Sequence, residues 1–271
     1  MSISLSSPSV DTPDGFEARL QRRNVLQQSA LSTVPSNAVH KPHGAIPNTP
    51  LAASTVSFIL GGLFSPALLL FTLGALDILP RPCYQLGFFA AAWAGFHWLE
   101  FAVTAGWNLE KCSTDSFLLE NGAPYHIANT VAILEYILTL YFKPSLKSYP
   151  YISVIGIAMT LVGQTLRSTA MIHASTNFSH SVAFRKLETH QLVTDGIYAW
   201  FRHPSYAGFF YWALGTQLVL QNPISFVGFT IVTWRFFYFR TRAEERALVK
   251  FFGDDYVDYR KRVGVMIPFI P

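Results

Sequence analysis

The stretch HQLVTDGIYAWFRHPSYAG, residues 190–208, precedes two apolar segments, after which the chain continues as FRTRAEERALVKFFGDDYVDYRKRV, residues 239–263. The first stretch combines turn-forming residues, Asp195-Gly196 and Pro204, with histidine, tyrosine and arginine side chains. The second alternates acids and bases in the manner of a helix that leaves lipid. Polar and aromatic groups next to apolar segments predict a functional site at a membrane interface.

The composition of the 271-residue chain indicates a membrane protein. Charged residues make up 13% of the sequence, against about 25% in soluble domains, while 51% of residues are hydrophobic and 15% are aromatic. The net charge of +4 lies beside apolar runs, which is typical of cytosolic loops and speaks against a surface that binds nucleic acid. Cys83 and Cys112 are too few for a disulfide framework or a metal cluster, so no metal site is expected.

Apolar segments predict an all-α, polytopic membrane protein with about six transmembrane helices, the last two forming a C-terminal helical hairpin. Four segments reach the length of about 20 residues that spans the hydrocarbon layer. The last two are about 22 to 26 Å long, which is short for a full crossing, and Gln221-Asn222-Pro223 joins them. The six predicted segments are 54–79, 84–106, 124–142, 150–172, 206–220 and 223–239.

The distribution of basic residues predicts the orientation of these helices. Seven Lys and Arg residues follow residue 239, and the positive-inside rule places them in the cytosol. Six spans put both termini and the loop 173–205 on that side. Lys143 and Lys147 fall on the opposite side and run against the rule. The Asn177-Phe178-Ser179 sequon is then expected to remain free of glycan.

Residues 1–50 are rich in Ser, Pro and Asn and lack the continuous apolar core of a signal peptide. We interpret them as a disordered N-terminal tail; a short amphipathic helix at residues 16–27 is the alternative. The first transmembrane helix then serves as the insertion signal, and residues 51–271 form one integral membrane domain.

Several ionisable residues fall inside the predicted spans and are expected to face the bundle interior, because charge in lipid is costly. Two roles remain open for them: the wall of a polar cavity, or pairs with one another that fix the helix packing. No catalytic role is assigned to them. These residues are His97, Glu100, Glu135 and Arg167.

The Asp195-Gly196 turn predicts a site on the cytosolic face. A helical turn over residues 197–201 would present Tyr198, His203 and Tyr206 around a crevice. Ring stacking, hydrogen bonds to ribose and a counter-charge are what a cofactor of adenosine size needs. The alternative is an interfacial aromatic belt of Tyr198, Trp200 and Tyr206.

Arg240 and Glu244 lie one helical turn apart, where the apolar hairpin gives way to charged sequence. Paired with each other, they would contribute only a few tenths of a kcal/mol. Turned toward the crevice, Arg240 would offer a fixed cation to a carboxylate, and Glu244 an acceptor for cofactor hydroxyl or ammonium groups. The remaining charges from Arg242 to Arg262 are expected to contact solvent and phospholipid headgroups.

Taken together, these motifs resemble the isoprenylcysteine carboxyl methyltransferase family, in its fungal type with six spans. The resemblance covers roughly residues 85–271 and is dense from residue 176. Patterns such as LVT-x-G-x-Y with RHP-x-Y also occur in membrane sterol reductases and phospholipid methyltransferases, whereas the continuation to R-x-x-x-E and FFG-x-x-Y-x-x-Y-x-x-RV is more specific. The motifs are TNFSH (176–180), HQLVTDGIYAWFRHPSYAG (190–208), WRFF (234–237), RTRAEE (240–245), FFGDDYVDYRKRV (251–263) and IPFIP (267–271).

The resemblance implies an enzyme that transfers a methyl group from S-adenosylmethionine to the C-terminal carboxylate of a farnesylated or geranylgeranylated cysteine. It implies as partners CaaX-processed proteins, such as Ras-like GTPases and lipidated peptide pheromones, together with membrane lipid and no nucleic acid. It also implies a multi-pass protein of the endoplasmic reticulum membrane with an active site that faces the cytosol.

The same resemblance implies the residues of the site. Arg240 contacts the substrate and is the catalytic residue. The family often has a longer polar residue at the position of Ala183, so a contact there would involve only the backbone. The implied cofactor-binding residues are Ala183, His190, Gln191, Leu192, Val193, Tyr198, His203, Pro204, Ser205, Tyr206 and Glu244.

The implied methyl transfer requires orientation more than proton transfer. A carboxylate with a pKa of about 3.5 is ionised at neutral pH and needs no general base. Holding oxygen, methyl and sulfur in line can remove about 7 to 11 kcal/mol of the barrier. We expect Arg240 to hold the carboxylate, the prenyl chain to come from the membrane and the cofactor to come from the cytosol.

Two other classes of protein share parts of this pattern. An NADPH-dependent membrane sterol reductase would have a similar C-terminal crevice, although a longer helical bundle is usual there. A non-enzymatic membrane adaptor would use the same residues only as an aromatic belt and as helix caps. A ligand-binding measurement separates the three classes. The methyltransferase should bind S-adenosylhomocysteine, the sterol reductase should bind NADPH, and the adaptor should bind neither.

Overall fold

The computed structural model describes residues 44–183, 185–186 and 190–271. Within these residues the chain forms long α-helices and short 3-10 turns, without a strand. This confirms the predicted all-α class. The helices are α2 (Pro50–Ala75), α3 (Pro82–Trp107), α4 (Ala123–Phe142), α5 (Pro150–Ala174), α6 (Pro204–Leu220), α7 (Pro223–Phe252) and α8 (Asp254–Arg262).

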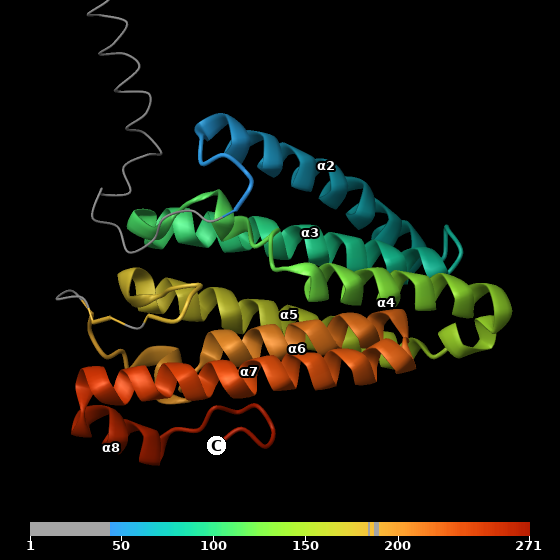
Figure 1. Ribbon diagram of the computed structural model, residues 1–271. Coiled ribbons are helices and arrows are strands. Elements are labelled where there is room, and N and C mark those ends of the chain that lie inside the picture. Colours follow the sequence, from blue (N-terminus) through green and yellow to red (C-terminus); the bar gives the residue numbers. More distant parts are fainter. Residues whose placement is uncertain (1–43, 184, 187–189) are drawn as a thin grey trace, which may run out of the picture.

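The long helices α2 to α7 correspond to the six predicted segments. Each has a proline in its first turn, where the fixed φ and the missing N–H suit a helix start. Successive helices alternate in direction, so the start of α2 and the end of α7 lie at the same end of the bundle (Figure 1). The main difference from the prediction is α7, which continues to Phe252, well past residue 239.

Residues just before α2 are fastened to the loop between α3 and α4. The amides of Gly44 and Ala45 donate to the carboxylates of Asp115 and Glu120, the latter at 2.8 Å. The hydroxyl of Thr49 caps α2 by accepting from the amide of Ala52. Residues 1–43, which hold most of the proposed tail and the alternative helix at 16–27, lie outside the described residues.

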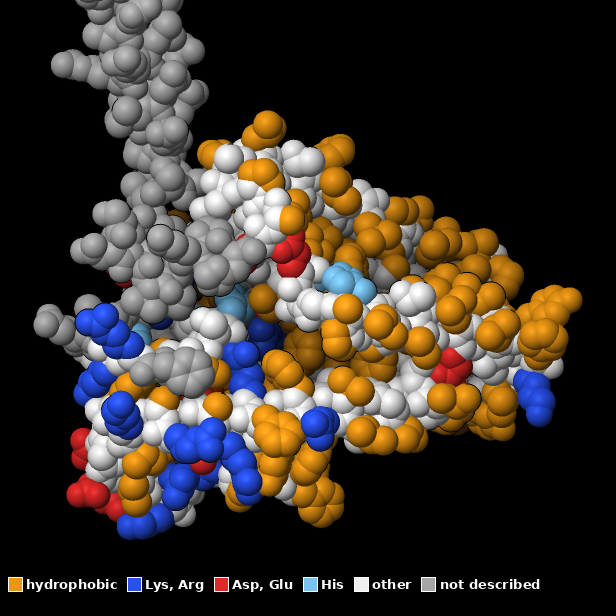
Figure 2. Space-filling model, in the orientation of Figure 1, with side chains coloured by type: hydrophobic (Ala, Val, Ile, Leu, Met, Phe, Trp, Pro, Cys, Tyr) orange, Lys and Arg blue, Asp and Glu red, His pale blue; other side chains and the backbone are white. Residues whose placement is uncertain are grey.

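The outer surface of the bundle is apolar over most of its length. By length and composition, α2 and α3 could cross a membrane, with mean hydropathies of 2.1 and 1.3, and only 11% of the most apolar window of α2 is buried. Figure 2 shows hydrophobic side chains over one end of the bundle and Lys and Arg side chains gathered at the other, around the end of α7 and α8. Lipid is the environment that such an apolar exterior requires.

Helices α5 and α6 pack at close range through glycines. A Cβ atom added to Gly163 would lie 2.6 Å from the carbonyl oxygen of Gly208, and one added to Gly208 would lie 2.7 Å from that of Gly163. Gly156 and Gly215 face each other in the same way. Small residues that let helix backbones approach are typical of packing in membranes.

The ionisable residues within the helices are only partly paired with one another. The guanidinium of Arg167 donates to both carboxylate oxygens of the buried Glu100, which confirms that pair. His97 instead binds the carbonyl oxygen of Phe117 at 2.7 Å, and a tyrosine hydroxyl. Glu135 accepts from two backbone amides at the start of α7, where the helix dipole favours an anion. Mutual pairing is therefore wrong for His97 and Glu135.

Of the two lysines that ran against the positive-inside rule, Lys147 has a structural role. The Lys147 ammonium is buried and donates to the carbonyl oxygens of Leu220 and Gln221, at 2.9 and 3.0 Å, and to Asn222 Oδ1 at 2.7 Å. It thus caps the C-terminus of α6, where the helix dipole is negative. The cap on α6 therefore accounts for a lysine at this end of the bundle, without reference to membrane topology.

Candidate active site

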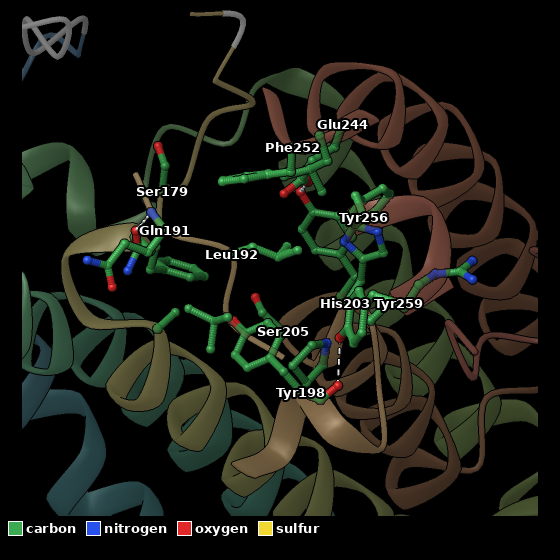
Figure 3. Close-up of a pocket in the computed structure, with 18 residues that line it drawn as sticks. Ser179, Gln191, Leu192, Tyr198, His203, Ser205, Glu244, Phe252, Tyr256 and Tyr259 are labelled. Atoms are coloured by element: carbon green, nitrogen blue, oxygen red, sulfur yellow. Dashed lines mark hydrogen bonds between the residues drawn. The ribbon is translucent and has the colours of Figure 1, made fainter. Parts of the chain in front are cut away.

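A pocket lies at the end of the bundle where α5 ends, α6 begins and the charged half of α7 meets α8 (Figure 3). In Figure 3, Gln191, His203, Ser205, Glu244 and Tyr256 surround a common space although they come from four separate segments. Most of the predicted cofactor residues line this pocket. They are Gln191, Leu192, Val193, Tyr198, His203, Pro204, Ser205, Tyr206 and Glu244.

The turn before α6 forms as predicted. Asp195 precedes a 3-10 turn at Gly196–Ala199, and Gly196 has a φ of +53°, a conformation that favours glycine. A Cβ atom on Gly196 would also lie 2.3 Å from the ring of His173, whose Nε2 is 3.2 Å from the Asp195 carboxylate. The turn directs Tyr198 inward, and its hydroxyl donates to the carbonyl oxygen of Ala170.

Of the three residues in the aromatic-belt alternative, two line the pocket. Trp200 is 72% exposed and lies outside the pocket lining. Tyr198 and Tyr206 line the pocket, and Tyr206 is buried with its ring stacked on that of His203 at 5.2 Å. Two of the three rings are thus part of the site.

Two predicted cofactor residues, Ala183 and His190, are not part of the pocket lining. Ala183 is half-buried in the segment before the site, and His190 lies with its ring 6.4 Å from that of Phe251. Burial lowers the pKa of His190, as do the nearby charges of Lys111 and Lys186.

Other pocket residues were missed by the sequence analysis. Asn177 lines the pocket, and its Oδ1 accepts from the amide of Gln191 at 2.8 Å, which holds the two loop segments together. The hydroxyl of Tyr259 donates to the carbonyl oxygen of Tyr198 at 2.6 Å. The TNFSH motif and the tyrosines three residues apart in YVDY were the available signals. The missed lining residues are Ala174, Asn177, Phe178, Ser179, Arg202, Leu248, Phe252, Tyr256 and Tyr259.

A second, larger cavity of about 520 Å³ adjoins the pocket. Its walls are mainly apolar and aromatic and come from α4, α6 and α7, with Arg240 and Arg167 at its polar end. Figure 2 shows this face hollowed between α4 and α7. The two spaces share Phe178, Ser179, Ser205 and Tyr206 in their linings, so they meet at the start of α6.

The hydroxyl of Tyr206 connects the residues predicted for substrate and cofactor. It donates to the Glu244 carboxylate and accepts from Arg240 Nε at 2.8 Å. Arg240 Nη2 donates to the carbonyl oxygen of His180, while Nη1 makes no hydrogen bond to the described residues. Arg240 lines the apolar cavity and Glu244 the pocket, so each faces its own space instead of forming a pair with the other.

The neighbouring acid, Glu245, has a structural role. Its carboxylate lies 3.0 Å from Arg202 and 3.6 Å from Arg260. Burial favours the neutral form, but His203 and the two guanidinium groups hold the pKa of Glu245 below its ordinary value. Arg202 also donates to the carbonyl oxygens of Arg260, Val263 and Pro271 and so fixes the last residues against the site. These contacts make Arg202 a structural residue.

Arg167 combines both roles that were left open for the buried ionisable residues. It pairs with Glu100, it lines the apolar cavity, and its Nη1 donates to Ser205 Oγ at 3.0 Å. His180 Nε2 contacts the same Glu100 carboxylate at 3.0 Å. A polar network thus runs from the middle of the bundle to the junction of the two spaces.

Neither cysteine lines the pocket or the cavity. Burial raises the pKa of the Cys112 thiol to about 11, which keeps it protonated, and Cys112 lies outside both linings. Among the described residues, no group of His, Cys, Asp or Glu side chains could hold a metal ion. The two spaces at this end of the bundle are an aromatic and polar pocket and an apolar cavity that has Arg240 and Arg167 in its lining.

The fold and the site together define a membrane-embedded helical enzyme that places a polar pocket against an apolar cavity. The model of the isoprenylcysteine carboxyl methyltransferase family matches residues 155–250, which include all the predicted site residues. The chain belongs to this family and is a methyltransferase. The match favours this class over the sterol reductase and the adaptor.

Relatives and a solved structure agree with the family match. The human protein-S-isoprenylcysteine O-methyltransferase is 38% identical over 95% of this chain and 95% of its own length. The enzyme of the same name from Saccharomyces cerevisiae is 45% identical over 67% of this chain and 79% of its own length. A structure described as the eukaryotic intramembrane Ras methyltransferase is 37% identical, with a TM-score of 0.71 over 81% of this chain and 84% of that chain.

Proposed function

We propose that this protein methylates the C-terminal carboxylate of a prenylated cysteine, with S-adenosylmethionine as the methyl donor. The observation that supports this most is the junction of the two spaces at Ser179, Ser205 and Tyr206. A polar, aromatic pocket suits the cofactor, and an apolar cavity headed by Arg240 suits a lipid chain that ends in a carboxylate. The junction lets the two reactants meet.

The pocket residues fit an adenosyl cofactor. The hydroxyl of Tyr256 lines the pocket, is buried and makes no hydrogen bond to the described residues, so it is available to a ligand. Phe252 and Tyr198 offer ring faces, and Glu244 offers a carboxylate for hydroxyl or ammonium groups. When bound, S-adenosylmethionine supplies a methyl group on a positively charged sulfur.

Arg240 is placed to hold the methyl acceptor. Its Nε and Nη2 donate to Tyr206 and His180, which orients the guanidinium at the cavity wall and leaves Nη1 without a hydrogen bond to the described residues, so it can donate to a carboxylate. With the cofactor bound, the ionised carboxylate held at Arg240 would be placed to accept the methyl group, with S-adenosylhomocysteine as the leaving group. No proton moves in this step, so the site needs alignment and exclusion of water rather than a general base.

The surroundings of the site support an enzyme that takes its substrate from the membrane. We propose that all six helices α2 to α7 cross the endoplasmic reticulum membrane, with the basic end and the pocket facing the cytosol. The substrates are then CaaX-processed proteins, such as Ras-like GTPases and lipidated peptide pheromones. The apolar cavity draws the prenyl chain from lipid, while the cofactor comes from the aqueous side.

A methyl ester assay tests this proposal directly. Purified protein in detergent is incubated with S-adenosylmethionine and N-acetyl-S-farnesyl-L-cysteine, and base-labile methyl ester is measured. The same preparation is titrated with S-adenosylhomocysteine and with NADPH. Ester formation together with S-adenosylhomocysteine binding is expected. Binding of NADPH alone, or of neither compound, would contradict the proposal.

A further inference from the structure

The apolar cavity has a defined depth. Its wall along α7 runs from Arg240 to Phe229, a distance of about 16 Å at the helical rise of about 1.5 Å per residue. Its wall along α6 runs in the same direction from Ser205 to Trp212. A lipid chain whose carboxylate is held at Arg240 therefore points its far end toward Trp212 and Phe229.

The deep end is closed by a packed aromatic cluster. The Trp212 side chain is buried, and its ring centroid lies 4.6 Å from that of Phe96 and 5.8 Å from that of Phe209. Behind it the cluster continues to Ala132, which is 0% exposed. Because this layer is filled, a longer chain gains room only if Trp212 moves or is replaced.

We propose that Trp212 sets the length of prenyl chain that the cavity encloses. This proposal rests on the proposed function and deepens it by naming a specificity-determining residue. A prenyl chain that follows the wall along α6 meets the indole of Trp212, and a geranylgeranyl chain, which is one isoprene unit longer than a farnesyl chain, needs more room there. Ala128, on α4, lines the cavity and packs against the same cluster, so the size of its side chain also limits the space at this depth.

The competing route for the longer chain is lateral. Val232 and Phe236 line the cavity but are 51% and 53% exposed on the outer face of α7. A chain that turned outward beside them would leave the bundle between α4 and α7 and would not reach Trp212. Substitutions at Trp212 should change the ratio of geranylgeranyl to farnesyl activity if the chain follows the inner route, and should leave it unchanged if the chain turns outward.

The test compares kcat/KM for N-acetyl-S-farnesyl-L-cysteine and N-acetyl-S-geranylgeranyl-L-cysteine. Trp212→Leu is expected to raise the ratio of geranylgeranyl to farnesyl activity about 10-fold or more, since each added carbon in an apolar pocket changes specificity by roughly 10-fold or more. Ala128→Leu is expected to lower that ratio. Trp98→Leu is the matched control, because Trp98 is 47% exposed and lies outside both linings, and it should leave the ratio unchanged.

The outcomes separate this proposal from the proposed function. Binding of S-adenosylhomocysteine reports whether each variant is folded, and Ala128→Leu decides the question if Trp212→Leu fails that check. A wild-type protein that methylates neither analogue would overturn the proposed function. The role of Trp212 would be wrong if the wild-type protein is active but Trp212→Leu and Ala128→Leu leave the ratio of geranylgeranyl to farnesyl activity unchanged. It would also be wrong if only Val232→Trp changes that ratio.

Discussion

At the scale of single residues, Arg240 is the side chain whose chemistry is hardest to replace. Arg240→Lys keeps the charge but loses the planar guanidinium that reaches Tyr206, His180 and the cavity at once. Turnover of farnesylated cysteine should fall by at least about 100-fold, because the acceptor carboxylate is no longer aligned. S-adenosylhomocysteine affinity, measured by calorimetry, should change little.

The control for this variant is Arg246→Lys, an exposed arginine on the same helix that lies outside both linings. It should retain normal turnover. If Arg240→Lys and Arg240→Ala were both nearly as active as the wild type, the role of Arg240 as carboxylate holder would be wrong. Arg167 would then be the next candidate, because it also heads the cavity.

Glu244 belongs to the cofactor side of the same junction. Glu244→Ala removes charge-assisted hydrogen bonds worth about 1.5 to 3 kcal/mol, so S-adenosylhomocysteine should bind about 10- to 150-fold more weakly. Asp255→Ala, on the exposed first turn of α8, is the comparison and should bind normally. An unchanged dissociation constant in a folded Glu244→Ala protein would remove Glu244 from the cofactor site.

At the scale of the elements, the contact between α5 and α6 determines whether the site assembles. Gly163→Ala would push a methyl group to within 2.6 Å of two backbone atoms of α6. Overpacking of this kind costs about 1 to 3 kcal/mol, and it displaces the start of α6 relative to α5. We expect a lower melting temperature in detergent and a loss of activity.

Gly228→Ala on α7 is the matched substitution, since nothing lies within 4 Å of its added Cβ atom. It should be neutral or slightly stabilising, because alanine favours helix more than glycine does. Equal melting temperatures for the two alanine variants would show that the close approach of α5 and α6 is not needed.

The hairpin between α6 and α7 depends on a buried cation. Lys147→Met would leave the carbonyl oxygens of Leu220 and Gln221 without their charged donor. We expect destabilisation of about 1.5 to 3 kcal/mol in thermal unfolding. Lys143→Met, at an exposed position four residues earlier, should change the unfolding temperature little, and an equal effect of both would argue against capping.

At the scale of the whole molecule, orientation in the membrane is testable at Asn177. The side chain lines the pocket and binds the amide of Gln191, so a glycan there would also block the site. We expect no glycan on Asn177 when the protein is expressed in cells, as judged by the absence of a mobility shift after endoglycosidase treatment. A glycan at this position would place the pocket in the lumen and overturn cytosolic cofactor access.

The sequence by itself determined the all-α class, the approximate ends of the long helices except the C-terminal end of α7, and half of the pocket lining. These follow from local properties: apolar runs long enough to span lipid, prolines at helix starts, and the Asp195-Gly196 turn, whose glycine is required by its positive φ. The family motifs around His203 and Glu244 were also contiguous enough to be recognised. Local signals were sufficient because each of these features is fixed by neighbouring residues.

Only the tertiary structure decided which distant groups meet. It brought Asn177, Tyr256 and Tyr259 into the pocket and paired Glu245 with Arg202. It also placed Glu135 and Lys147 at helix ends, where they bind backbone groups. Each of these contacts joins segments that are far apart in the sequence, and its free energy depends on burial and geometry that no local pattern encodes. The apolar cavity and its closure by Trp212 likewise exist only once α4, α6 and α7 are packed together.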